Sequence, residues 1–287
     1  SVEEDVASGG LDEDSIAYHA ARAKGGCGLT IIEAASVHSS SENTLFNRDD
    51  RVLPGFEALL KAVKPYGMRV FEQLFHGGHQ TYGEGRRPPW SASTVPSPAL
   101  NAVPIPMGES EIAEIIDCFA EAARRCRDGG LDGVEIHAAH GYLIHQFLSP
   151  MTNLRTDRWG GSLENRARFL VEITRAVRRA AGKDYVVGVR YSASQAPGSL
   201  TEDEIRQVNA MLMAEGLIDF VDASLGDYYR MDSMVSGMHA PTGYELPSSG
   251  RIAEGVPLPR IVSGRFRTLE DAEQVLREGT ADMVSLV

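Results

Sequence analysis

Residues 133–142 decide the fold, and they read GVEIHAAHGY. The two aliphatic residues at the start alternate with Glu135 and His137, which is the period of a strand whose two faces meet different surroundings. The aliphatic face suits a layer of helices, so we expect His137 to point into the interior of a sheet, near the carboxyl end of the strand. Gly141 then permits a sharp turn.

Six further apolar runs predict the same kind of strand on either side of this stretch. They are rich in Val and Ile, and they alternate along the chain with longer segments of helical period. Near-continuous apolar strands between helices indicate a buried parallel sheet. The seven predicted strands are Gly28–Ala35, Arg69–His76, Gly133–Ala139, Tyr185–Ser192, Asp219–Leu225, Arg260–Gly264 and Met283–Val287.

Helix start signals lie between these strands. Thr201 and Thr268 are each followed three residues later by an acid, Glu204 and Asp271, which is the spacing of a capping box. Ser162 precedes a mostly apolar stripe of helical period in the same way. The predicted helices include about Asp14–Lys24, Glu111–Asp128 and Leu163–Ala181, and the long predicted loops are Gly83–Gly108 and Gly226–Pro259.

This alternation in 287 residues predicts one α/β domain, a (β/α)8 TIM barrel. A doubly wound open sheet could also hold seven strands, but the closed barrel is the commoner single-domain solution at this length. Because an eighth strand is missing, we expect the barrel to be truncated. Strand one and the region after strand eight are then outside the sequence, and residues 1–287 are a fragment of a longer chain.

Composition excludes several classes of function. The formal net charge of −12 disfavours nucleic acid and anionic membrane as partners, since both attract positive surfaces. No apolar run is long enough for a membrane span, and the acidic N-terminus is no signal peptide. The three cysteines cannot form a disulfide framework and lack Cys-x-x-Cys spacing. We therefore expect a cytoplasmic protein with a small-molecule substrate, while its oligomeric state is unreadable.

The residues that can carry chemistry gather around the 133–142 stretch. His137, His140 and Tyr142 are expected to converge at the mouth of the barrel, where two imidazoles and a phenol could hold an oxygen and deliver a proton. Two other interpretations are open for these residues alone. They could be satisfied structural side chains, or the histidines could be a metal pair, although no third ligand follows in zinc-protease spacing.

Other predicted strands add polar groups to the same mouth. Gln73 stands among apolar neighbours, and its amide both donates and accepts, which suits the pyrimidine edge of a flavin. Arg190 is placed inward by alternation, where a guanidinium needs an anion. That anion is either a reduced flavin or an inward acid such as Glu135. Gly264, after strand seven, lets the backbone approach a phosphate.

Together these residues resemble the Old Yellow Enzyme family of FMN-dependent oxidoreductases, especially its 2,4-dienoyl-CoA reductase-like branch. The most specific parts are residues 133–150 and 153–166, and the likeness covers nearly the whole chain. The resemblance implies FMN at the barrel mouth and NAD(P)H as the electron donor. It implies a 4Fe-4S cluster and FAD only for a C-terminal region that this chain does not contain.

The resemblance also implies a role for each site residue. His137 and His140 are expected to bind the substrate carbonyl, and Tyr142 is expected to donate a proton. The expected cofactor-binding residues are Ala34, Gln73, Arg190, Gly264 and Arg265, the last two at the phosphate. No metal ligand is expected.

The expected reaction is hydride transfer from NAD(P)H through FMN to the C=C bond of an α,β-unsaturated carbonyl compound or dienoyl thioester. An amine dehydrogenase or demethylase of the same superfamily is the nearest alternative. A flavin-free barrel lyase or isomerase, and a barrel remnant that only binds a partner, are alternatives from other classes. The lyase or isomerase would need a Schiff-base lysine or acid–base carboxylates at strand ends.

Overall fold

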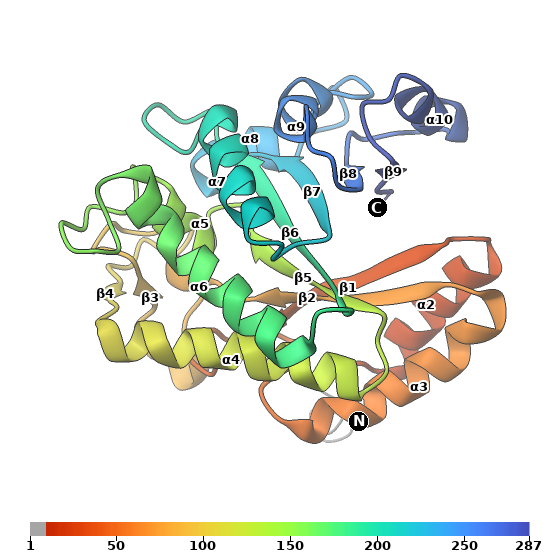
Figure 1. Cartoon of the computed structure of the whole chain (residues 1–287), viewed down its shortest axis with the longest axis horizontal. Coiled ribbons are helices and arrows are strands. Elements are labelled where there is room, and N and C mark those ends of the chain that lie inside the picture. Colours follow the sequence, from red (N-terminus) through yellow and green to blue (C-terminus); the bar gives the residue numbers. More distant parts are fainter. Residues whose placement is uncertain (1–9, 287) are drawn as a thin grey trace.

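The computed structural model describes residues 10–286 and contains a parallel sheet of seven strands in the order β1-β2-β5-β6-β7-β8-β9 (Figure 1). Each strand lies within a residue or two of its predicted range, apart from the shorter β8 and β9; the predicted end at Val287 lies outside the described residues. The strands are β1 (Leu29–Ser36), β2 (Arg69–Phe75), β5 (Gly133–Ala138), β6 (Val186–Ala193), β7 (Phe220–Leu225), β8 (Arg260–Val262) and β9 (Met283–Val284).

Helices connect and cover the strands (Figure 1). The predicted capping boxes are present: Thr201 accepts from the backbone N–H of Glu204, and Thr268 accepts from that of Asp271. These contacts satisfy amides that a helix start leaves free. The helices are α2 (Glu13–Lys24), α3 (Leu53–Val63), α4 (Glu109–Asp128), α5 (Leu143–Leu148), α6 (Leu163–Ala181), α7 (Glu202–Ala214), α8 (Met231–Met234), α9 (Leu246–Ala253) and α10 (Leu269–Arg277).

The two long predicted loops are partly structured, and this corrects the prediction. Residues 83–108 contain a small parallel pair, β3 (Trp90–Ser91) and β4 (Ile105–Pro106). Residues 226–259 contain α8 and α9, the second of which packs on β7 and buries Ile252 and Ala253. Polar turn residues dominated both segments in the sequence, so the short elements between them had no clear periodic signal.

Side chains on the inner face of the sheet form layers along the strands. The lowest layer is apolar, with Phe71, Phe220 and Ile261 packed together near the strand starts. Gly133 and Gly188 make room for it, because a Cβ at Gly188 would come within 2.2 Å of the Phe220 ring. This layer closes the interior from below, as layered side chains do in TIM barrels. The upper layers are therefore left for polar residues.

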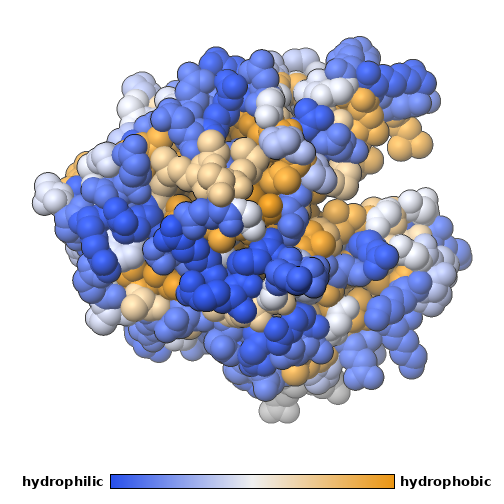
Figure 2. All heavy atoms as spheres, viewed as in Figure 1, coloured by the Kyte–Doolittle hydropathy of each residue, from blue (hydrophilic) through white to orange (hydrophobic). Residues whose placement is uncertain are grey.

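The sheet curls into a half-barrel rather than a closed one. Among residues 10–286, β1 and β9 are the edge strands and do not pair with each other. Figure 2 shows the surface hollowed between the end formed by α10 and β9 and the end formed by α2 and α3. The predicted α/β fold of TIM-barrel type is confirmed, with seven strands of a barrel in the described residues.

Two further findings concern membrane-spanning helices and the burial of the cysteines. Within the described residues, no helix is both long and apolar enough to cross a membrane. Cys126 is buried, Cys118 is half-buried and Cys27 is exposed.

Candidate active site

A cavity of about 700 Å³ opens at the carboxyl ends of the strands. Its volume falls within the range of small-molecule and cofactor sites. Six of the eight predicted site residues line it together: Ala34, Gln73, His137, His140, Tyr142 and Arg190. Ala34 reaches it from β1, where the register against β2 shifts between Ile32 and Ala35 and so bulges the strand. The structure thus brings together side chains that are more than 150 residues apart in the sequence.

The turn after β5 is held in an uncommon conformation. His140 and Gly141 both have positive φ, at 59° and 76°, and a non-glycine residue rarely adopts such an angle. Buried groups fix the turn: the backbone N–H of His140 donates to Ser192 Oγ at 2.7 Å, and that of Gly141 donates to His145 Nδ1 at 3.0 Å. Strained backbone held by its surroundings is common at functional sites.

The two histidines of the site contact each other. Nδ1 of His137 accepts from the backbone N–H of Ala139 at 3.2 Å, so the proton of the neutral ring is on Nε2. That Nε2 lies 3.4 Å from Nδ1 of His140, whose Nε2 in turn lies 3.0 Å from Ser224 Oγ. Burial, followed by the positive charge of Arg190, lowers the pKa of both histidines well below its usual value. Both rings are therefore neutral hydrogen-bond donors near pH 7.

Tyr142 stands beside this pair. Its ring packs edge-on against His137 and Phe75, with centroid distances of 5.0 Å and 4.6 Å. Its phenol oxygen lies 3.0 Å from that of Tyr228, which also lines the cavity. Burial and the contact with Tyr228 raise the pKa of Tyr142 above its usual value. The phenol therefore keeps its proton near neutral pH.

A layer of charged and polar side chains lies on the inner face of the strands. Nε2 of Gln73 donates to Glu135 at 2.5 Å, and Arg190 lies 3.7 Å from the carboxylate of Asp222. Burial opposes the charge of Arg190, but the carboxylates of Asp222, Glu135 and Glu245 hold its pKa above the usual value. Asp222 is thus the nearer partner of Arg190, where the sequence suggested Glu135.

This layer tests whether the residues present fit FMN. Arg190 lines the cavity, yet its buried Nε finds no acceptor among the described residues. Among residues 10–286, the Gln73 amide is hydrogen-bonded to Glu135 alone, so its carbonyl can accept from a ligand. The polar edge of a flat ring could accept from Arg190 Nε and donate to the Gln73 carbonyl. The small side chain of Ala34 leaves room for the ring. The residues therefore fit the cofactor.

Gly264 and Arg265 follow β8 and do not line this cavity. The carbonyl of Gly264 accepts from Gly243 N at 2.6 Å. The guanidinium of Arg265 is turned toward a neighbouring loop, where it donates to the carbonyls of Met238 and Ala240. Their assignment to a phosphate site stays a prediction.

Sequence reasoning missed three polar residues of the site. Asp222 and Ser224 alternate on β7 and face the cavity side, a period-two signal that was present in the sequence. Tyr228 lies just after β7, in a turn capped by Asp227, which accepts from Tyr229 N and Arg230 N. Its position depends on the packing of two strand-end loops, so no local pattern could reveal it. Within residues 10–286, no group of three potential ligands could hold a metal ion.

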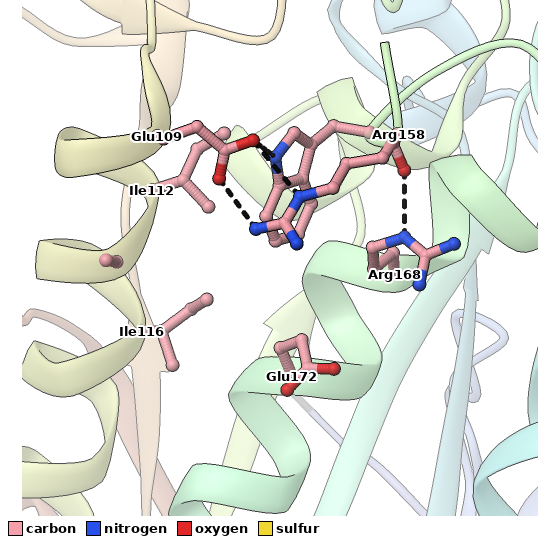
Figure 3. A pocket seen from close by; sticks show the side chains of 8 residues that line it. Glu109, Ile112, Ile116, Arg158, Arg168 and Glu172 are labelled. Atoms are coloured by element: carbon pink, nitrogen blue, oxygen red, sulfur yellow. Dashed lines mark hydrogen bonds and ion pairs between the residues drawn. The ribbon is translucent and has the colours of Figure 1, made fainter.

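A second, smaller pocket of about 300 Å³ lies elsewhere, between α4 and α6 (Figure 3). Its charged groups are already engaged: Arg158 and the Trp159 indole both bind Glu109, and Arg168 binds the carbonyl of Arg158. It contains none of the predicted site residues. Arg158 and Trp159, which belong to the distinctive 153–166 segment, thus have a structural role: they connect α4 to α6.

The fold and the cavity define the class of protein: a β/α-barrel enzyme with its site at the carboxyl ends of the strands. The chain belongs to the NADH:flavin oxidoreductase / NADH oxidase family, because the sequence model of that family matches residues 4–287. The expected Old Yellow Enzyme relationship is confirmed.

Two relatives and one solved structure show how similar this chain is to known proteins. The NADH oxidase of Thermoanaerobacter brockii is 38% identical over 97% of this chain and 44% of its own length. A multifunctional alkene reductase/demethylase OYE of Caballeronia cordobensis is 34% identical over 94% of this chain and 41% of its own. A structure of 2-naphthoyl-CoA reductase with 2-naphthoyl-CoA superposes with a TM-score of 0.86 at 29% identity, over 94% of this chain and 44% of that one. The chain thus spans less than half of each.

Proposed function

We propose that this chain is the catalytic barrel of a longer enzyme that reduces the C=C bond of an α,β-unsaturated carbonyl compound. The observation that carries the proposal is the convergence of His137, His140 and Tyr142 on the cavity that Gln73 and Arg190 also line. Bound FMN would supply the hydride, after reduction by NAD(P)H.

The histidine pair is proposed to bind the carbonyl oxygen of the substrate. The 3.4 Å contact between the rings is longer than an ordinary hydrogen bond, so a substrate oxygen can replace it at small cost. Nε2–H of His137 is then free to donate to that oxygen, with His140 as the second donor. Donors aimed at developing negative charge contribute about 3 kcal/mol each in comparable sites.

Tyr142 is proposed to protonate the α-carbon, and Tyr228 to hold the phenol in place. The two oxygens are 3.0 Å apart, and Tyr142 is packed between Phe75 and His137, which leaves its ring little freedom. A phenol that keeps its proton in the resting state suits an acid needed only after charge develops. Arg190 and Gln73 would hold the polar edge of FMN.

Dienoyl or aryl thioesters are the substrate class that we favour within this reaction type. The likeness to 2-naphthoyl-CoA reductase supports a conjugated thioester, since its barrel superposes closely on this one. The thioester carbonyl would occupy the histidine pair. The long segments 83–108 and 226–259 would border the rest of the molecule.

The test uses the full-length protein. The bound cofactor is identified by its absorbance spectrum and mass, the flavin is reduced anaerobically with NADH or NADPH, and reoxidation is followed on adding enones and dienoyl thioesters. We expect FMN, and reoxidation by at least one of these compounds. An FMN protein that no conjugated carbonyl compound reoxidises would contradict the proposal.

A second candidate, oxidation or demethylation of an amine, is favoured by two carboxylates. Asp12 and Glu33 line the same cavity and could attract a cationic amine. The alkene reductase/demethylase relative carries both activities in its name. The same protein tests this candidate: an amine substrate would reduce the oxidised flavin without NAD(P)H, whereas an enone would not.

A further inference from the structure

We propose that Glu135 and Asp222 share a single proton, and that this pair positions the charge of Arg190 for the flavin. Neither residue has a role in the reaction described above. The inference deepens the proposed function, on which it rests for the identity of the ligand. Both residues are positioning residues, because they would act on the flavin through Arg190 and Gln73.

Unsatisfied atoms carry the first step of the argument. Oε1 of Glu135 and Oδ1 of Asp222 are both buried and find no hydrogen-bond partner among the described residues. Both are acceptors when ionised, so two charged carboxylates here would leave both atoms without donors. A buried polar atom without a partner is costly. One proton held between the two carboxyl groups gives each atom a partner.

Charge gives the second step. Glu135 and Asp222 are 0% and 1% exposed, and both act on the one guanidinium of Arg190. Two ionised carboxylates and one guanidinium would leave a net negative charge in the interior of the barrel. Like charges that are buried close together cannot both ionise cheaply. A retained proton makes the group of three neutral.

The surroundings of Glu135 agree with this. Burial, and then the charge of Asp222, raise the pKa of Glu135 to about 8, against the opposing effects of Arg190 and the Gln73 amide. Glu245, at the start of α9, also acts on Arg190, and it accepts from Ser263 at 2.6 Å. The nearby His137 and His140 are neutral, so Arg190 is the cation that Glu135 and Asp222 face.

The shared proton has a consequence for both flavin ligands. It reduces by one the number of negative charges that face the guanidinium, so Arg190 could still attract the negative charge of a reduced flavin. Oε2 of Glu135 meanwhile accepts from Gln73 Nε2 at 2.5 Å, which keeps the Gln73 carbonyl turned to the ligand. Loss of the proton would add a negative charge beside Arg190 and make reduction of a bound flavin harder.

The experiment measures the midpoint potential of the flavin in the full-length protein as a function of pH. The variants are Glu135→Gln, which mimics the protonated acid, and the double variant Glu135→Gln/Asp222→Asn. Glu72→Gln is the matched control, because Glu72 is a fully buried carboxyl on the same β2 strand as Gln73, bonded on the helix side to Asn47. Infrared spectra of each protein test for a protonated carboxyl group.

We expect the flavin midpoint potentials of wild type and Glu135→Gln to be equal at low pH and to differ at high pH. Below about pH 7, Glu135→Gln and wild type should have the same potential, and above about pH 8 the wild type should fall below the variant. The double variant should lie above wild type at every pH, and Glu72→Gln should follow wild type. If Glu135→Gln already exceeds wild type at low pH by the same amount as at high pH, Glu135 is ionised throughout and the proposal is wrong.

The infrared band separates this inference from the proposed function. Glu72 also holds a proton below about pH 7, so the comparison is made in proteins that carry Glu72→Gln. A protonated carboxyl band that is present in Glu72→Gln, but absent from Glu72→Gln/Glu135→Gln, supports the shared proton even if no enone is reduced or no flavin is bound. Absence of that band from Glu72→Gln near neutral pH would overturn the shared proton, whatever the enzyme's activity.

Discussion

The phenol oxygens of Tyr142 and Tyr228 lie 3.0 Å apart across the mouth of the cavity, and they come from the loops after β5 and β7. This contact joins two segments that are 86 residues apart in the sequence. It fixes the one hydroxyl that we propose as the proton donor. Its removal should therefore affect the chemistry more than the fold.

For Tyr228→Phe, we expect enone reduction to slow about fivefold, which corresponds to one hydrogen bond of about 1 kcal/mol. The pKa of Tyr142 should fall at the same time, because the contact with Tyr228 raises it. Steady-state turnover and a tyrosinate absorbance titration measure the two effects. Flavin content should be unchanged, and unaltered turnover would show that Tyr228 does not support Tyr142.

The pH dependence of enone reduction should lack a histidine step. Free histidine has a pKa of about 6.5, but burial and Arg190 lower the pKa of His137 and His140 well below it. Both rings stay neutral from about pH 6 to pH 8, so kcat/KM should be flat there with respect to them. An inflection near pH 6.5 that disappears in His137→Gln or His140→Asn would contradict this.

Glu72 should make the folded protein less stable as pH rises. Burial raises the pKa of Glu72 to about 7 from a usual value of 4.5, so the unfolded chain releases its proton first. Stability from this group is thus present below about pH 4.5 and is lost as pH rises to about 7, by about 3 kcal/mol. Glu72→Gln removes the loss.

Urea unfolding at about pH 5 and pH 8 checks this expectation. The free energy of unfolding of Glu72→Gln, relative to wild type, should increase between the two values. A difference that does not change with pH would mean that the carboxyl group is ionised throughout.

Gly188→Ala should destabilise the protein by disturbing the lowest apolar layer inside the sheet, which contains Phe71, Phe220 and Ile261. A Cβ there would come within 2.2 Å of the Phe220 ring, which is itself buried against Phe71. Overpacking of this kind costs about 1–3 kcal/mol. The smaller side chain in Gly188→Ala/Phe220→Leu should recover part of that loss in thermal unfolding. If Gly188→Ala is as stable as wild type, the ring has space that the structure does not show.

Local patterns predicted the strands and the inward direction of His137 and Arg190, because alternation along a strand is a local property. The sequence could not show that Arg190 meets Asp222 rather than Glu135, since that depends on the register between β6 and β7. Tyr228 was missed for a similar reason. Its place beside Tyr142 arises from two loops that meet only in the folded barrel.

The central claim is that Tyr142 delivers a proton to a substrate held by the histidine pair. The most direct test compares the anaerobic reoxidation of the reduced full-length protein by an enone in wild type and Tyr142→Phe. We predict equal flavin content and reoxidation at least about 100-fold slower in the variant, in line with the contribution of a general acid. Equal rates with the flavin fully bound would show that the proton comes from elsewhere.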